Sequence, residues 1–350
     1  MSQIDRHNNF DLIRLVAAFQ VMLWHGAVHL GTFDASYNFL AVIYHIPGVP
    51  IFFTISGFLI SSSFDRNGFN LKKYFRNRSL RIFPALWVCT IITAGLLAYF
   101  GSLTNIKEFF VWLIAQFSFF QFYAPTSLKT WGTGHPNGSL WSIAVELQFY
   151  VVLPIIILIA SKLKKRTLVN LFLVLLFLLS IGFKYFVEST EYGKSIPILT
   201  KLSGNFVLYY LHFFLTGIIM YKNYDVLQKW IKDKVLYWFV GYVIYVLVLK
   251  TWLGLYENPY SINIFGIIAN TILSFLTLSF AFSYQNLSKK LLNENDISYG
   301  IYIYHMPIVN TMLSLGLTGT FGHWFGMMAV TILIAIFSWK LIEKKALSYK

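Results

Sequence analysis

Long stretches without a charged side chain constrain the fold of this chain most. Ile82 to Phe100, Ile262 to Tyr284 and Ile297 to Gly316 contain no Asp, Glu, Lys or Arg. Each is long enough to cross a hydrocarbon core of about 30 Å as a helix. Only 12% of the 350 residues are charged, whereas soluble globular proteins carry about 25%. The sequence therefore predicts an all-α integral membrane protein.

Basic residues set the predicted topology. Lys and Arg number 28 and Asp and Glu 14, and the excess lies in short segments between apolar spans, as expected for cytoplasmic loops. This distribution argues against a nucleic-acid partner. The short stretch from Phe109 to Tyr123 would reverse that order if it crossed, so we expect it to be re-entrant or interfacial. About ten transmembrane helices remain, with both termini cytoplasmic, near residues 10–30, 40–63, 82–100, 142–160, 168–187, 205–221, 235–252, 262–284, 297–316 and 321–341.

The chain has no internal repeat, low-complexity tract or segment of soluble-domain size. We therefore expect residues 1–350 to form a single membrane domain. Cys89 is the only cysteine, which excludes an intrachain disulfide and a thiolate metal cluster, and its apolar surroundings favour a packing role. The sequence contains no HExxH pair, Gly-rich phosphate loop or GxSxG elbow, so we predict no metal.

The first predicted helix carries two polar residues on one face. Arg14 and His25 are eleven positions apart, which is close to three turns and about 16 Å along a helix axis. A cation near the cytoplasmic boundary and an imidazole beyond the midplane would suit a long ligand with an anionic head. In the alternative reading, Arg14 extends to lipid phosphates and His25 hydrogen-bonds to a neighbouring helix.

A pair of arginines lies at the cytoplasmic start of the third predicted span. Arg78 and Arg81 are three residues apart in RNRSLRIFP, so their guanidinium groups face the same way, which suits phosphate recognition. Taken alone, however, a basic cluster before a span is better explained as an ordinary topology signal.

Glu146 is the outstanding carboxylate of the fourth predicted span, in SLWSIAVELQFY. Asn137-Gly138 predicts a turn and Ser142 a helix N-cap, so Glu146 should lie about one turn inside the outer boundary. An unpaired carboxylate is costly there, which favours a functional role. Trp141 could equally be an interfacial belt residue.

His305 lies roughly midway along the ninth predicted crossing, in SYGIYIYHMP. Pro307 follows two residues later, and a proline within a span often frees backbone groups at a cavity. His305 is therefore a further candidate for the site.

These segments, in this order, resemble the membrane acyltransferase 3 family, the acetylases of bacterial surface polysaccharides and related glycans. SLWSIAVELQFY is the most specific match, and the similarity covers essentially the whole chain. The other matching segments are FDLIRLVAAFQVMLWH, FFTISGFLISSSF, RNRSLRIFPALW and SYGIYIYHMPIV.

The resemblance implies ten helices with cytoplasmic termini and an acyl-CoA donor, usually acetyl-CoA, that enters from the cytoplasm. It implies functional roles for five residues and, less directly, for the late-helix His305. As a hypothesis, three arginines bind the phosphates of the donor, His25 acts as general base or transient acyl acceptor, and Glu146 orients the acceptor or the imidazole. The five residues are Arg14, His25, Arg78, Arg81 and Glu146.

The implied acceptor is a hydroxyl of a cell-surface or lipid-linked carbohydrate, and the implied location is the bacterial cytoplasmic (inner) membrane. Many members of the family carry an extracytoplasmic hydrolase-like domain after the last helix, which we do not expect here because the sequence stops at Lys350. Transfer would then be completed in the membrane domain or by a partner.

A transporter or glycan exporter is the competing class, because buried charges can also line a solute or proton path. It would predict internal repeats with paired broken helices, and the sequence shows no such symmetry.

Overall fold

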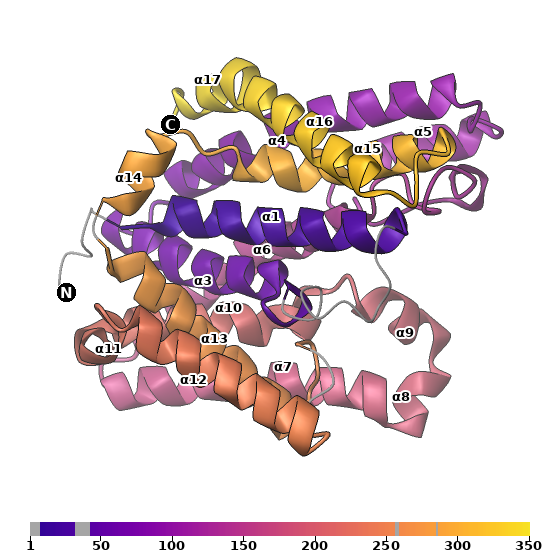
Figure 1. The fold of residues 1–350 in the computed structure, drawn as a ribbon. Helices are drawn as coiled ribbons and strands as arrows, with labels where there is room; N and C mark the ends of the chain where they lie inside the picture. Colours follow the sequence, from indigo (N-terminus) through magenta and orange to yellow (C-terminus); the bar gives the residue numbers. More distant parts are fainter. Residues whose placement is uncertain (1–7, 32–42, 256–258, 285) are drawn as a thin grey trace. The chain divides into compact units, whose positions relative to one another are not determined.

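The computed structural model describes residues 8–31, 43–255, 259–284 and 286–350, and the described chain is helical without strands (Figure 1). The first residues of the second predicted span, 40–42, lie outside the described residues. The long helices are α1 (Phe10–His29), α3 (Gly48–Arg66), α4 (Leu71–Tyr99), α6 (Trp141–Lys162), α7 (Arg166–Ser189), α10 (Val207–Lys222), α12 (Val235–Leu247), α13 (Ile264–Phe282), α15 (Ser298–Ser314) and α16 (Phe321–Ser338). Shorter helices are α5 (Ile106–Gln116), α8 (Glu191–Ser195), α9 (Pro197–Ser203), α11 (Tyr224–Ile231), α14 (Leu287–Leu292) and α17 (Lys344–Leu347).

Eight helical segments of the described chain are long and apolar enough to cross a membrane. The other two predicted crossings also coincide with helices, although both are shorter. One is α12, which a π-helical turn extends to Trp252, and the other is α15 with 17 residues. The prediction of a multi-span helical protein is confirmed, and the count of ten and the cytoplasmic termini stay predictions.

The third predicted span begins earlier than expected. Residue 82 was the predicted start, but α4 begins at Leu71. The residues before 82 are basic and polar, yet Lys, Arg and Leu are good helix formers, so the helix continues below its apolar part. Arg78 and Arg81 therefore lie within a helix, on neighbouring positions of one face.

The predicted re-entrant or interfacial stretch contains one short helix. α5 has 11 residues, which corresponds to about 16 Å of rise and is too short to cross a hydrocarbon core. Asn105 caps its first turn by accepting hydrogen bonds from the backbone N–H groups of Lys107 and Glu108. Residues 117–123 form turns rather than helix.

The chain divides into two compact units. Unit 1 comprises residues 1–14, 45–71 and 148–294, and unit 2 comprises residues 15–44, 72–147 and 295–350. The divisions fall within α1 and α6, so Arg14 belongs to unit 1 and both His25 and Glu146 to unit 2.

Aromatic stacking and close helix packing hold unit 1 together. α10 packs against α3 and α7, and the ring of Phe214 stacks between Phe53 at 4.3 Å and Phe149 at 3.9 Å. His212 of α10 lies 3.1 Å from the hydroxyl of Ser180 on α7. That contact is a hydrogen bond between helices, as expected for a histidine with a packing role.

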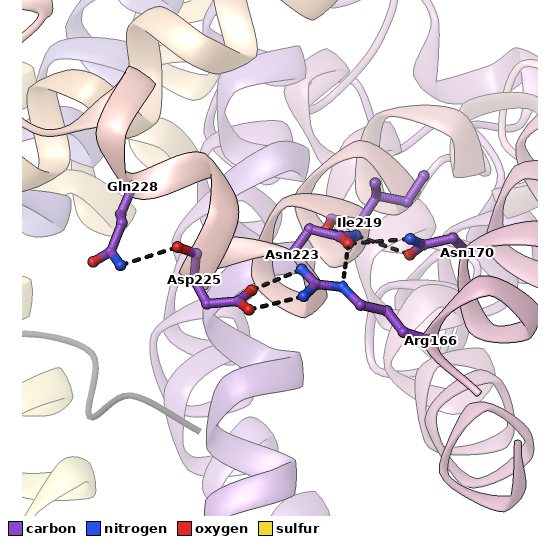
Figure 2. Close-up of polar contacts among 6 residues, drawn as sticks. All are labelled: Arg166, Asn170, Ile219, Asn223, Asp225 and Gln228. Carbon is purple, nitrogen blue, oxygen red and sulfur yellow. Dashed lines mark hydrogen bonds and ion pairs between the residues drawn. The ribbon is translucent and has the colours of Figure 1, made fainter. Parts of the chain in front are cut away.

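A polar network fixes the start of α7 to the junction of α10 and α11 (Figure 2). Arg166 donates two hydrogen bonds to Asp225, at 2.7 and 2.8 Å, and a third to Asn223. Asn223 and Asn170 exchange hydrogen bonds with each other. The Arg166 guanidinium holds the pKa of Asp225 below its usual range. Because the ion pair is exposed, it sets helix register more than it adds stability.

α15 forms the centre of unit 2. All thirteen residues from Ser298 to Asn310 are buried, as expected for a helix surrounded by other elements. α15 packs on α16 and contacts α4, since Tyr299 donates to the backbone carbonyl of Ile82 at 3.0 Å. The part of α1 in this unit approaches α16 closely at Gly26, where a side chain would collide with Met327.

Candidate active site

Two histidines far apart in sequence meet in unit 2. Nδ1 of His25 on α1 lies 2.8 Å from Nε2 of His305 on α15, and the two ring centroids are 5.1 Å apart with an angle of 23° between the ring planes. His305 is 0% exposed, whereas His25 is partly exposed. His25 is therefore the more exposed histidine of the pair, and His305 is fully enclosed.

His29 joins this pair, and sequence reasoning did not single it out. Its ring centroid is 5.8 Å from that of His25, because residues four apart share one helix face. The four-residue spacing of His25 and His29 was the signal in the sequence that could have identified His29.

The distance between His25 and His305 is that of a hydrogen bond and not of two ligands on one metal ion. Their nitrogens are 2.8 Å apart, whereas two nitrogens on one tetrahedral metal ion are roughly 3.3 Å apart. Within the described part of the chain, no group of three metal-ligating residues is suitably placed.

Pro307 frees a backbone carbonyl beside the histidine pair. A proline lacks the N–H that would bind the carbonyl four residues earlier, which is that of Ile303. Two side chains donate to this oxygen instead, Asn137 at 2.8 Å and Cys89 at 3.2 Å. The predicted packing role of Cys89 thus includes a hydrogen bond, and Pro307 creates the acceptor for it.

The segment before α6 is tied to α15 by Asn310. The side-chain oxygen of Asn310 accepts from the N–H and the hydroxyl of Thr133, both at 2.9 Å. Its amide nitrogen donates to the carbonyls of His135 at 2.8 Å and Pro136 at 3.2 Å. We call this contact the Asn310 latch. Gly132 makes it possible, because its φ is +56° and a side chain there would lie 2.6 Å from the Asn310 backbone.

His135 lies on the latched segment, and although the residue is exposed, part of its ring is covered. Partial burial, followed by the charge of Lys129, lowers the pKa of His135 below its usual range. At neutral pH this imidazole is therefore uncharged.

Ser142 does not cap α6 as predicted. The helix begins at Trp141 after a 3-10 turn over Gly138–Leu140, so Ser142 lies in the first turn. Its hydroxyl is 2.5 Å from that of Tyr302, which also donates to the carbonyl of Ser139 at 3.0 Å. Ser142 therefore connects α6 to the helix of His305. Sequence reasoning missed Tyr302, whose ring meets that of His305 edge-on at 6.0 Å.

The charges of Glu146 and Arg78 both act on the side chain of Tyr74. Both side chains are partly exposed, and both lie within electrostatic range of the buried phenol of Tyr74. Glu146 also acts on Tyr302. The structure therefore brings Glu146, Arg78 and the residues around His305 into one region of unit 2.

Arg81 has a carboxylate partner that the sequence did not reveal. Its guanidinium lies 2.5 Å from Asp296, and the two side chains are 17% and 8% exposed. Asp296 also accepts hydrogen bonds from the backbone N–H and the hydroxyl of Ser298, which begins α15. Arg81 is thus connected to the helix that carries His305.

Arg14 lies in α1 as predicted and pairs with Asp11 at 2.7 Å in unit 1. It shares its helix with His25, eleven residues later.

Comparison with known proteins identifies the family. A family model described as an acyltransferase domain matches residues 7–340. The chain belongs to the acyltransferase 3 family. Similar proteins of this kind include Nodulation protein 10 of Rhizobium leguminosarum bv. viciae, which is 30% identical over 98% of this chain and 94% of its own length.

A second similar protein, an O-acetyl transferase of Shigella phage Sf6, is 29% identical over 98% of the chain and 97% of its own length. A putative O-acetyltransferase of Staphylococcus aureus (strain COL) is 28% identical over 47% of the chain and 31% of its own length. No solved structure matches the chain. The protein is therefore a multi-pass membrane acyltransferase of the O-acetyltransferase type.

Proposed function

We propose that this acyltransferase moves an acetyl group from cytoplasmic acetyl-CoA to a hydroxyl of a cell-surface or lipid-linked carbohydrate, in the bacterial cytoplasmic membrane. We further propose that residues 1–350 act as one acyltransferase domain, which the family match over residues 7–340 supports.

The hydrogen bond between His25 and His305 carries this proposal. It joins a partly exposed imidazole to a buried one inside a chain of the acyltransferase family. An imidazole has a reference pKa near neutrality, so it can accept a hydroxyl proton or an acyl group. We assign the reaction to His25 because it is the more exposed histidine of the pair.

On the donor side, the proposed ligands of the phosphates are Arg14, Arg78 and Arg81, because guanidinium groups bind phosphate with charge-assisted hydrogen bonds. Arg78 and Arg81 lie three apart on one helix, which fits this role. Arg81 already binds Asp296, so a phosphate would share Arg81 with that carboxylate or displace it. Arg14 is included because it lies on α1, about three helical turns before His25.

On the acceptor side, Glu146 would orient the carbohydrate or the imidazole, with Trp141 and Ser142 shaping the start of the same helix. Glu146 is partly exposed and lies within electrostatic range of Tyr302. Ser142 holds Tyr302 in place through their mutual hydrogen bond.

In the proposed reaction the acceptor oxygen forms a bond to the acyl carbon and the bond from that carbon to sulfur breaks. His25 takes the proton of the acceptor hydroxyl and returns it to the leaving thiolate. If His25 instead carries the acyl group transiently, its nitrogen first displaces the thiolate from the acyl carbon, and the acceptor oxygen then displaces that nitrogen while the hydroxyl proton passes to the thiolate. Both routes leave the products acetyl ester and free thiol.

Two measurements test the proposal together. Purified protein with acetyl-CoA and a carbohydrate acceptor should release free thiol, and glycans from cells with the intact gene should carry acetyl groups that a deletion strain lacks. His25→Ala should behave like the deletion while the protein stays in the membrane. His323→Ala is the matched control, since His323 bonds to the carbonyl of Thr318 outside the site.

Thiol release without a change in any glycan would contradict the carbohydrate acceptor. Acetylation that persists in His25→Ala would contradict the role of His25. A transporter would leave acetyl-CoA unconsumed in the purified system.

A further inference from the structure

The hydrogen bonds of His305 define which of its nitrogens carries the proton. Nδ1 of His305 lies 3.2 Å from the carbonyl oxygen of Ile301, and the carbonyl of Tyr302 is also within its reach. A carbonyl can only accept a hydrogen bond, so Nδ1 must be the donor. A neutral imidazole has one N–H, and Nε2 of His305 therefore carries a lone pair.

The same reasoning extends to His25. Its Nδ1 lies 2.8 Å from Nε2 of His305, and that lone pair requires a donor. Nδ1 of His25 is therefore protonated and Nε2 of His25 carries its lone pair. The opposite arrangement would need an imidazolium at His305, which is 0% exposed, and an unpaired buried charge is costly.

Packing prevents His305 from changing this arrangement. The ring is fully buried, meets Tyr302 edge-on and is hydrogen-bonded to His25. A flip of the ring would place a C–H against the carbonyl of Ile301 and lose both hydrogen bonds. The orientation of His305 is therefore fixed by its own helix.

We infer that His305 is a positioning residue that makes Nε2 the reacting nitrogen of His25. This inference rests on the proposed function, because it assigns the atom of His25 that removes the hydroxyl proton or carries the acyl group. His305 itself does not touch the substrate. When His25 gains a proton at Nε2, its Nδ1–H bond to His305 strengthens, because a hydrogen bond from a charged donor is stronger.

Nitrogen NMR of the wild-type protein tests the protonation directly, without donor or acceptor. We expect histidine labelled with ¹⁵N in both ring positions to show His25 with a protonated Nδ1 and an unprotonated Nε2. The same spectrum should show His305 with a protonated Nδ1. Loss of one signal set in His25→Gln assigns the resonances. A protonated Nε2 at His25 would overturn the inference.

Substitution of His305 gives the kinetic test. His305→Leu removes the acceptor, so His25 should shift toward the Nε2–H form and kcat should fall by about 10²-fold or more with little change in KM for acetyl-CoA. His305→Gln places an amide oxygen near the former Nε2 and should restore most of kcat. His323→Leu is the matched control and should leave the His25 resonances unchanged.

The two proposals fail in different ways. If the resonances are as expected but no acyl group is transferred to any carbohydrate, the proposed function fails. If transfer occurs while Nε2 of His25 is protonated, or if His305→Leu keeps full kcat, the role of His305 fails. Should His305→Leu not fold, the wild-type spectrum still decides between the two tautomers.

Discussion

The Asn310 latch makes a prediction that needs no substrate. Asn310 is 0% exposed and makes four hydrogen bonds to the segment between Thr133 and Pro136. At a net value of roughly 1 kcal/mol for each bond, their removal in Asn310→Ala should weaken the closed segment by about 4 kcal/mol. Since every 1.4 kcal/mol is tenfold, the opening equilibrium should rise by about 10³-fold.

Tryptic cleavage after Lys129 measures this opening. Lys129 is exposed and follows a 3-10 turn over Thr126–Leu128, but cleavage requires the surrounding chain to leave its fold. When opening and closing are fast relative to cleavage, the rate follows the population of the open form. We therefore expect Asn310→Ala to be cut much faster at Lys129 in detergent, with the fragment identified by mass.

Two further variants make this experiment decisive. Thr311→Val is the matched control, because the Thr311 hydroxyl bonds to the carbonyl of Pro307 within its own helix, and its cleavage rate should not change. Gly132→Ala should act like Asn310→Ala, since it forces a side chain against the Asn310 backbone. An unchanged rate in Asn310→Ala would refute the latch as the element that holds the segment closed.

Two other predictions concern charged groups of unit 2. Arg81→Ala and Asp296→Ala should each destabilise the purified protein, because each leaves a largely buried charged partner behind. The double variant should lose about 3 kcal/mol less free energy of unfolding than the sum of the two single losses. Additive losses would contradict a coupled pair. The pKa of His135 is lowered in the folded protein, so the unfolded segment binds more protons below its reference pKa of about 6.5 and the closed segment becomes less stable as pH falls. Cleavage after Lys129, normalised to an unstructured peptide, should therefore accelerate from about pH 7.5 to about pH 5.5, and His135→Gln should abolish that acceleration.

Hydropathy located the spans well where the helix and its apolar part coincide. The predicted ranges 10–30 and 262–284 correspond to α1 at Phe10–His29 and α13 at Ile264–Phe282. At the third span the helix α4 is longer than the predicted crossing, 82–100, because hydropathy reports the part that lipid can cover and not the whole helix. The basic turns from Leu71 onward are helical for reasons of intrinsic propensity.

The candidate site was predicted residue by residue but not as a set of contacts. His25 and His305 were each identifiable from the cost of a polar group in a span, yet they are 280 positions apart, and nothing in the local pattern pairs them. Asp296 and Asn310 were not identified, because polar residues near a helix start or end are common. Ser142 was predicted as a cap, and only the tertiary fold provides Tyr302 as its partner.

The hydrogen bond of Cys89 has a practical consequence for labelling. Cys89 is the only cysteine of the chain, is 1% exposed and donates its S–H to the carbonyl of Ile303. A buried structural thiol is inert toward reagents in water, so the native protein already behaves as a cysteine-free background. Single cysteines introduced at the exposed positions Thr126 and Ser348 would then report, with a membrane-impermeant maleimide, on which side of the membrane each lies.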